Sequence, residues 1–277
     1  SGNLTAAERG VTDLAQALHS EGFSHITVLT GGDVTTEQVL KTLAQYESLR
    51  PETAVAYVAT HGATCPIRDR KSVIHHLRTT ETVVGGDCWD NTLTDEALID
   101  GLKQLEARHS VLVIEACMTI FGTGGAGDFR SADPWSDRHL EEIVLRSTSP
   151  GRFAVQLGAS LPYTDSFVDG LVDLKADLDG DGAVTALEAH DDAALMVRQV
   201  YPEQIPMRQQ SSVGLSQPVV LAGTPGEPQR ALLHGLPPEI EWGLGRIPVM
   251  LGPSGSLPVA SPGPLVCRGK LPACRLD

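Results

Sequence analysis

The sequence lacks any long apolar run and is poor in basic residues. No stretch of its 277 residues approaches the roughly 18 consecutive apolar residues of a membrane-spanning helix, so we expect no membrane span. Its 21 lysines and arginines are outnumbered by 35 aspartates and glutamates, which gives a formal net charge of −14. This charge argues against binding of nucleic acid or an anionic membrane, and it favours basic partners.

The N-terminus lacks the basic segment followed by an apolar one that marks a signal peptide. We therefore expect that any signal peptide has been removed already or never existed. Cysteine is scarce as well, with one residue at each of positions 65, 88, 117, 267 and 274. If Cys65–Cys88 and Cys267–Cys274 are disulfides, Cys117 stays free and the protein is extracellular or periplasmic. If all five are reduced, it is cytoplasmic. The sequence leaves both alternatives open.

Two apolar runs each end in a reactive side chain. Residues 111–117 (VLVIEAC) show no polar alternation, the pattern of a strand buried on both faces of a parallel sheet, and they end in Cys117. Residues 55–62 (VAYVATHG) form a second such run and end in His61-Gly62. Ligands of open α/β sheets bind outside the carboxyl ends of the strands. The thiol and the imidazole should therefore share one crevice, as a nucleophile beside its base.

The remaining pattern alternates helices and strands. Apolar spacing predicts helices over 6–20, 35–46 and 94–108, the first of them opened by the capping box of Thr5 and Glu8. Further strands are predicted at 25–29, 153–157 and 217–222, a loop over 64–90 and a flexible segment over 122–152. The alternation predicts an α/β fold, a mostly parallel sheet flanked by helices.

Residues 5–225 resemble the caspase-like cysteine peptidases, the superfamily of metacaspases, legumains and gingipains. The resemblance rests on the order of elements and on His61-Gly62, which precedes Cys117 by about the spacing quoted for caspases. Residues 115–119 (EACMT) depart from the Gln-Ala-Cys-x-Gly signature of caspases, so the chain is closer to the bacterial, metacaspase or legumain-like branches. The resemblance implies a caspase-like domain over 1–225 and a loop-rich, Pro/Gly-rich extension over 226–277. The family usually begins with a central strand, for which only residues 1–4 are present here.

The resemblance also implies an activity, that of a cysteine endopeptidase acting on protein or peptide substrates. His61 and Cys117 would form the catalytic dyad, and the backbone amides of Gly62 and Cys117 would stabilise the oxyanion.

Substrate specificity is implied by further positions. Glu115 and Asp33 match acidic S1 positions of metacaspases, which implies cleavage after Arg or Lys, with Asn and Asp as alternatives. Ala159 and Ser160 resemble the segment that lines the S1 pocket. An Arg-directed enzyme could also cut itself within 122–152, which contains Arg130, Arg138, Arg146 and Arg152.

An acidic loop at 177–188 fits the EF-hand pattern at positions 1, 3, 5, 6 and 12. Its carboxylates and one backbone carbonyl are what a seven-coordinate Ca²⁺ ion requires. The expected ligands are Asp177, Asp179, Asp181, the carbonyl of Ala183, and Glu188. We therefore expect one Ca²⁺ site, with a metal-free acidic turn as the alternative.

Other functions fit the sequence less well. A catalytically silent calcium-binding interaction module of the same fold is the main alternative, and the intact His61 and Cys117 argue against it. A flavodoxin-like cofactor binder would use the glycines of 122–127, but these follow the wrong strand. The adjacent His75 and His76 cannot both face one metal ion from a strand, so metal binding there is disfavoured. The sequence does not indicate an oligomeric state.

Overall fold

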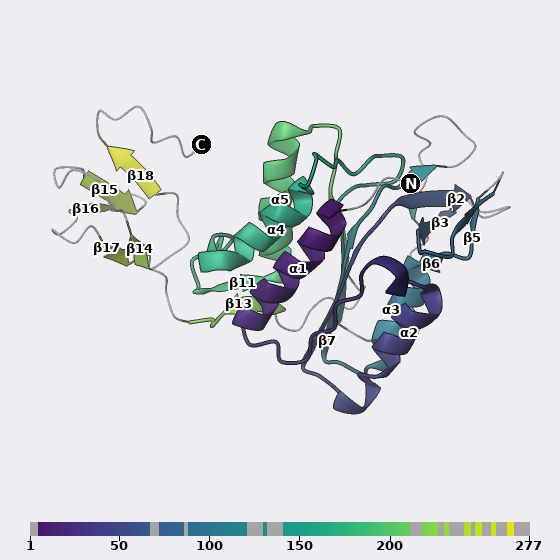
Figure 1. The fold of residues 1–277 in the computed structure, drawn as a ribbon. Helices are drawn as coiled ribbons and strands as arrows, with labels where there is room; N and C mark the ends of the chain where they lie inside the picture. Colours follow the sequence, from purple (N-terminus) through teal and green to yellow (C-terminus); the bar gives the residue numbers. More distant parts are fainter. Residues whose placement is uncertain are drawn as a thin grey trace.

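The computed structural model describes residues 5–66, 72–85, 88–120, 130–131, 141–210 and 218–226, together with the backbone of five short strands further on. At its centre lies a four-stranded sheet in the order β1-β7-β10-β12, in which β7 runs parallel to β1 and β10 while β12 is antiparallel (Figure 1). These strands are β1 (Thr53–Ala59), β7 (His109–Glu115), β10 (Glu141–Arg146) and β12 (Met207–Gln210).

Helices cover both faces of this sheet (Figure 1). The strand β7 is buried along its whole length, and its side chains alternate between two apolar clusters, Val111 and Val113 in one and Leu112 and Ile114 in the other. The first cluster includes residues of α1, α4 and α5, the second residues of α3, with α2 packed against it. The helices are α1 (Thr5–Ser20), α2 (Thr36–Ala44), α3 (Asp95–Gln104), α4 (Pro162–Leu171) and α5 (Ala186–Val200), with 3-10 turns η1 (Gly31–Asp33), η2 (Glu47–Leu49) and η3 (Val172–Leu174). The expected α/β architecture is confirmed.

The helix starts follow from the sequence. The hydroxyl of Thr35 accepts a hydrogen bond from the backbone N–H of Gln38, 3.0 Å away, and Thr94 does the same for Ala97 at 3.2 Å. Such caps satisfy an N–H that has no partner inside the helix, which is why threonine marks these starts. The three predicted helices are confirmed, although α3 ends at Gln104 rather than at residue 108.

A second, smaller sheet, here called the side sheet, continues from the end of β1. It runs in the order β6-β3-β2-β8, with β9 paired to β3. Its strands are β2 (Gly62–Pro66), β3 (Ser72–Leu77), β6 (Leu93–Thr94), β8 (Thr119–Ile120) and β9 (Arg130–Ser131), and β4 (Val83–Val84) pairs with β5 (Trp89–Asp90) beside it. The loop predicted over 64–90 is therefore wrong. The apolar–polar alternation expected of a strand was not recognisable in β3, because its two adjacent histidines interrupt that pattern in the sequence. In the structure these histidines lie on opposite faces of the strand.

Two predicted strands are absent from the described part of the chain, and β10 and β12 of the central sheet were missed. Residues 25–29 and 153–157 form no ladder in the described part of the chain, and Phe153 is 69% exposed. A short apolar run becomes a strand only where a neighbouring strand accepts its hydrogen bonds. The strand β10 lies instead inside the segment predicted to be flexible, with Ile143, Val144 and Leu145 buried.

Near its end, the described chain forms short antiparallel pairs. The strand β11 (Ala183–Thr185) pairs with β13 (Val220–Gly223), which confirms a strand in the segment 217–222. Beyond it β14 pairs with β17, and β15 pairs with both β16 and β18. These are β14 (Arg230–Leu232), β15 (Glu241–Leu244), β16 (Ile247–Met250), β17 (Ser256–Pro258) and β18 (Leu265–Arg268). The domain boundary at residue 225 stays a prediction. Among the described residues, no helix has the length and apolar character needed to cross a membrane.

Candidate active site

His61 and Cys117 follow the carboxyl ends of two neighbouring parallel strands. The ladder between β1 and β7 ends at the pair Ala59 and Glu115, and the N–H of Thr60 donates to the Glu115 carbonyl at 3.1 Å. His61 and Cys117 each stand two residues beyond that last pair. The register therefore puts His61 and Cys117 at the same edge of the sheet. That the imidazole acts on the thiol stays a prediction.

Gly62 packs directly against the backbone of the cysteine. A β-carbon placed on Gly62 would lie 2.3 Å from the Cys117 carbonyl oxygen and 2.9 Å from the Ala116 side chain. It would also lie 2.6 Å from Nε2 of His75 on β3. Only glycine fits between these three groups.

His75, on β3 of the side sheet, makes a hydrogen bond to the backbone of Cys117. Its Nε2 lies 2.9 Å from the Cys117 carbonyl oxygen, and its ring is buried. Burial lowers the pKa of His75 to about 4, so the ring is neutral and Nε2 carries the proton that it donates. The role of His75 could not be predicted from the sequence, because its contact with Cys117 spans 42 positions and depends on the pairing of β2 with β3.

The thiol lies against a segment that follows β10. Sγ of Cys117 is 3.4 Å from the backbone N–H of Ala154 and 3.7 Å from the Ala154 carbonyl oxygen. The Met118 N–H also donates to the Arg152 carbonyl, at 3.0 Å. Burial raises the pKa of the Cys117 thiol, while the Ala154 N–H partly opposes this shift.

His61 is half-buried at the start of the side sheet. Burial lowers its pKa, and the positive charge of Arg78 lowers it further. With the thiol pKa raised and the imidazole pKa lowered, both side chains are neutral near pH 7.

Glu115 is buried under the first turn of α4, with an exposed fraction of 2%. Its Oε2 accepts hydrogen bonds from the N–H and the hydroxyl of Thr164, at 3.1 and 3.0 Å. Burial raises the pKa of Glu115 to about 7, although Thr164 and the nearby Ser147 hydroxyl pull it down. Neither its other oxygen, Oε1, nor the Ser147 hydroxyl has a partner within normal hydrogen-bond geometry among the described residues. Thr164 was missed by sequence analysis because only the docking of α4 on β7 brings it to Glu115.

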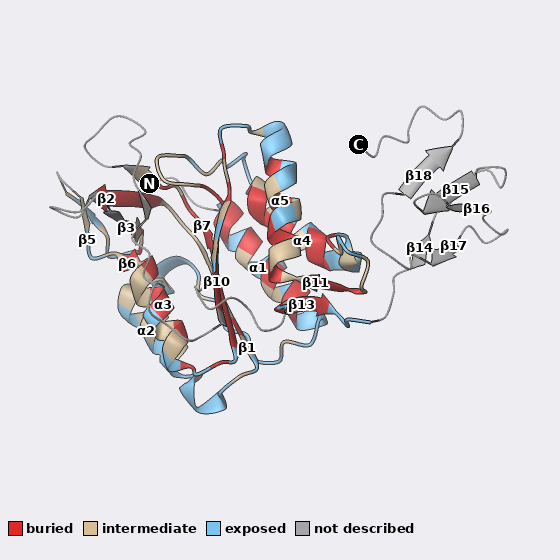
Figure 2. Ribbon diagram, turned by 180° about the vertical axis from the view of Figure 1, so that it is seen from behind, coloured by how far each residue is buried: buried red, intermediate tan, exposed pale blue. Residues whose placement is uncertain are grey.

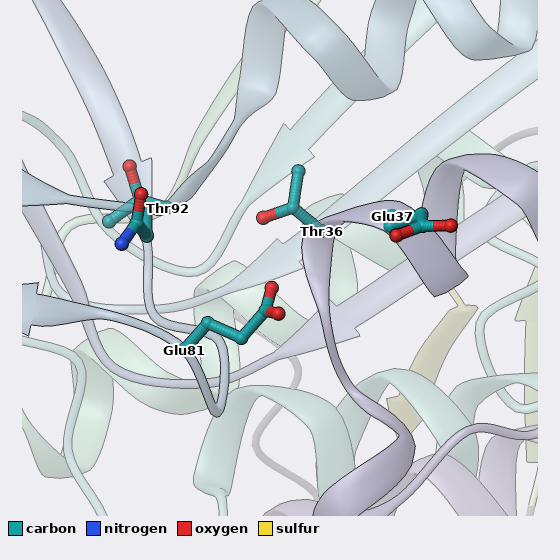
Figure 3. Close-up of a pocket in the computed structure, with 5 residues that line it drawn as sticks. Thr36, Glu37, Glu81 and Thr92 are labelled. Atoms are coloured by element: carbon teal, nitrogen blue, oxygen red, sulfur yellow. The ribbon is translucent and has the colours of Figure 1, made fainter.

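Asp33 lies elsewhere, exposed in η1 just before α2. Asp33 thus lies on the side of the central sheet that α2 covers, whereas the side chain of Glu115 faces α4 on the other side. Near Asp33, the N-terminal turn of α2 borders an open pocket of about 480 Å³ (Figure 3). The residues that line it are Thr36, Glu37, Glu81, Asn91 and Thr92.

Ala159 and Ser160 lie on the turn that leads from the Cys117-contacting segment into α4. Leu157 and Ser160 exchange two backbone hydrogen bonds of 2.9 Å, which closes the turn. Ala159 is exposed, while the Ser160 hydroxyl is held by the carboxylate of Asp165. Both residues lie within the segment that the sequence assigned to the S1 wall, and Ala159 stands on an exposed turn six residues before Asp165.

The acidic loop joins η3 to α5 and is held by its own backbone. Oδ1 of Asp177 accepts from the N–H of Gly180 at 2.8 Å, and Oε1 of Glu188 accepts from the N–H of Leu178 at 3.1 Å. Carboxylate oxygens of Asp177, Asp179 and Glu188 lie within 4.8 Å of one another. This donor set is of the type that hard divalent cations take in proteins. Ala183 is part of β11, and Asp181 accepts from its N–H at 2.9 Å.

The predicted cysteine pairing is confirmed in part, and one predicted self-cleavage site is wrong. Cys65 and Cys88 form a disulfide and Cys117 is free, but the compartment is not determined by this. Residues 122–127, Arg138 and Cys274 lie outside the described residues, and so do the side chains of Arg130 and Cys267. Arg146 is wrong as a cleavage site, because it is 1% exposed and bound to Asp95 at 2.7 Å.

Comparison with known proteins supports the fold alone. No family model and no curated protein matches the sequence. Protein GSU0716 from Geobacter sulfurreducens is similar in structure, with a TM-score of 0.56 and 15% identity over 79% of this chain and 88% of that one. Caspase-1 from Spodoptera frugiperda is similar with a TM-score of 0.53 and 16% identity over 78% and 81%. The chain thus has a mixed α/β fold, with a parallel-containing sheet flanked by helices, that is similar to the fold of a caspase.

Proposed function

We propose that the chain is a cysteine endopeptidase with a His61–Cys117 dyad. The observation that carries the proposal is the shared position of the two residues, each two places beyond the last pair of adjacent parallel strands. The similarity of the fold to a caspase agrees with it. Protein or peptide is the substrate class that this chemistry serves.

In the proposed reaction the neutral imidazole of His61 takes the thiol proton as sulfur attacks the scissile carbonyl. The tetrahedral oxyanion then receives hydrogen bonds from the backbone amides of Gly62 and Cys117. The imidazolium returns its proton to the leaving amine, and water hydrolyses the thioester. Because the pKa of His61 is lowered, the base stays in its active form somewhat below the pH at which an ordinary histidine protonates.

Cleavage after Arg or Lys is the specificity that we propose. Oε1 of Glu115 has no hydrogen-bond partner of normal geometry among the described residues, which leaves an acceptor for a cation that reaches it. A basic side chain would have to displace the residues that cover this buried oxygen. Beside α2, on the other side of the central sheet, Asp33 and the pocket residues Glu37 and Glu81 give the surface a negative charge that suits a basic peptide.

Calcium binding by the acidic loop is a further part of the proposal. Asp177, Asp179, Asp181 and Glu188 would supply carboxylates, and Ala183 its carbonyl. The clustering of three of these carboxylates within 4.8 Å supports it. Bound Ca²⁺ would neutralise carboxylates that otherwise repel one another.

Self-processing would use the remaining arginines of the segment 122–152, which are Arg130, Arg138 and Arg152. Arg152 is partly exposed, and its guanidinium is paired with Glu203. The test is a two-fragment pattern that appears in the wild-type protein and not in a Cys117→Ala variant.

The proposed function is tested with a panel of fluorogenic peptides that differ only at P1, each assayed with and without Ca²⁺. We expect cleavage of the Arg and Lys peptides and none in the Cys117→Ala variant. Cleavage after Asp or Asn alone would contradict the specificity. A second candidate, a catalytically silent calcium-binding module, is favoured by the acidic loop, and it predicts Ca²⁺ binding with no cleavage of any peptide.

A further inference from the structure

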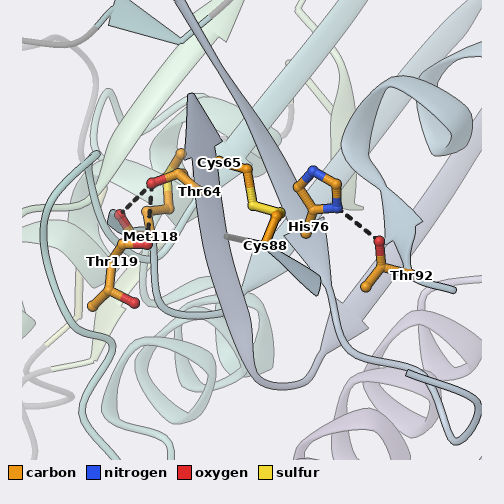
Figure 4. Close-up of a disulfide and its surroundings, with 7 residues drawn as sticks. All are labelled: Thr64, Cys65, His76, Cys88, Thr92, Met118 and Thr119. Atoms are coloured by element: carbon orange, nitrogen blue, oxygen red, sulfur yellow. Dashed lines mark hydrogen bonds between the residues drawn. A yellow bond between two sulfur atoms is a disulfide. The ribbon is translucent and has the colours of Figure 1, made fainter. Parts of the chain in front are cut away.

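The side sheet carries a cluster of two sulfur atoms and an imidazole. Cys65 on β2, His76 on β3 and Cys88 just before β5 each offer one ligand atom, and these atoms lie within 4.8 Å of one another (Figure 4). The sulfur atoms of Cys65 and Cys88 are joined as a disulfide. Cys65 is buried and the other two residues are half-buried, so the cluster is partly shielded from water. The strand β2 is coloured as buried in Figure 2.

The register of the β2–β3 hairpin explains why Cys65 and His76 meet. Cys65 pairs with Ile74, and His76 pairs with Ala63. Side chains two residues apart on a strand share a face, so His76 lies diagonally across from Cys65. His75 points to the opposite face, toward the Cys117 carbonyl. The two adjacent histidines therefore belong to separate sites, and one of them is available to the sulfur cluster.

The ring of His76 is already oriented. Its Nδ1 lies 2.8 Å from the hydroxyl oxygen of Thr92 (Figure 4). With the proton on Nδ1 and donated to Thr92, Nε2 carries the lone pair that a metal ion requires. Metal-ligating histidines are usually held by such an outer hydrogen bond.

We propose that Cys65, Cys88 and His76 bind one Zn²⁺ ion when the disulfide is reduced. Two thiolates and one imidazole, with water in the fourth position, are a donor set that zinc takes in proteins. A dithiol reductant supplies two electrons and two protons to the S–S bond, which becomes two thiols while the reductant becomes a disulfide. Zn²⁺ then displaces the two thiol protons as two Zn–S bonds form.

Either state ties the Cys88 segment to β2, the strand that begins at Gly62. The hydroxyl of Thr64 on that strand lies 3.2 Å from the Met118 carbonyl oxygen and 3.1 Å from that of Thr119 (Figure 4). The metal would thus hold the strand next to the candidate active site in reducing surroundings, as the disulfide does in oxidising ones. Metal binding at these three residues does not require the proposed peptidase activity.

The test uses the full chain with Cys117→Ala, Cys267→Ser and Cys274→Ser, so that Cys65 and Cys88 are the two cysteines left. The protein is reduced with a trialkylphosphine, supplied with excess Ca²⁺ to fill the acidic loop, and titrated with Co²⁺. We expect one Co²⁺ ion with thiolate-to-cobalt charge-transfer absorption, which Zn²⁺ abolishes. The unreduced protein should show no such absorption.

Matched variants in the same background identify the ligands. His76→Ala should weaken Co²⁺ binding by at least about tenfold, while His19→Ala, at an exposed position of α1, should leave it unchanged. Cys88→Ser and Cys65→Ser should each remove most of the charge-transfer absorption, and thermal melts show whether each variant is folded. The proposal is overturned if the reduced protein gives no charge transfer at about millimolar Co²⁺, or if His76→Ala and His19→Ala bind alike.

Discussion

The candidate active site and the acidic loop are stabilised in opposite ways. Around Cys117 the contacts come from distant parts of the chain, with His75 42 positions away and Ala154 37 positions away. In the acidic loop the carboxylates bind backbone N–H groups of the same loop, at most 10 positions away. A site built from local contacts can be recognised in one continuous sequence motif. A site built from distant contacts exists only once the sheet has formed.

The largest expected effect separates the chemistry of the active site from its fold. Cys117→Ala should reduce peptide cleavage by at least about 10³-fold, and His61→Ala nearly as much, because each group needs the other. The melting temperature should change little, since neither side chain fills a large space. Substantial activity in either variant would remove the peptidase proposal, whatever the acidic loop binds.

A second prediction concerns the buried charge beside the cysteine. The pKa of Glu115 is raised to about 7 from 4.5, so at intermediate pH the folded protein keeps a proton that the unfolded chain has lost. The stability contribution of Glu115 is therefore full below pH 4.5, falls as pH rises toward 7, and stays low above it. Glu115→Gln should remove this decline and raise the free energy of unfolding at pH 8 by on the order of 3 kcal/mol.

The measurement is urea unfolding of wild type and Glu115→Gln across this pH range. The exposed Glu47→Gln in η2 is the matched control, with no expected change. Parallel stability curves for wild type and Glu115→Gln would show that the Glu115 carboxylate is not held in the neutral form. If Glu115 also binds basic P1 residues, the same variant raises KM for Arg peptides.

A third prediction tests how tightly the distant contacts of the active site are packed. Gly62→Ala would place a β-carbon 2.3 Å from the Cys117 carbonyl oxygen, so the backbone has to shift. We expect a loss of stability of about 1–3 kcal/mol together with reduced cleavage. Gly32→Ala is the control, because nothing lies within 4 Å of its added carbon. Equal melting temperatures of the two variants would contradict the close packing of Gly62.

The smallest expected effect is that of calcium on the local site. At a Ca²⁺ concentration ten times the dissociation constant, binding should stabilise the protein by about 1.4 kcal/mol. Glu188→Gln should abolish this gain, and Glu203→Gln, an exposed residue outside the loop, should keep it. Calorimetric titration and melting with and without Ca²⁺ check both. An absence of binding at about millimolar Ca²⁺ would leave the loop an acidic turn.

Sequence patterns captured elements whose signals are local. The helices opened by Thr35 and Thr94 were readable because a capping hydroxyl and its N–H partner lie three residues apart. The strand β7 was readable because burial on both faces leaves an unbroken apolar run. The strand β10 was not, since its apolar run of Ile143, Val144 and Leu145 is short and flanked by charged residues. One of these is Arg146, which is buried with Asp95 and Gln209 as hydrogen-bond partners.

What the sequence by itself determined is the alternation of helices and strands, the positions of His61 and Cys117 at strand ends, and the spacing of the acidic loop. These follow from periodicity and from motifs that extend over a few residues. Tertiary structure alone decided that Glu115 is buried against Thr164, that His75 holds the Cys117 carbonyl, and that His76 lies beside two sulfur atoms. Such contacts depend on strand register and helix docking, which bring together residues that no local pattern links.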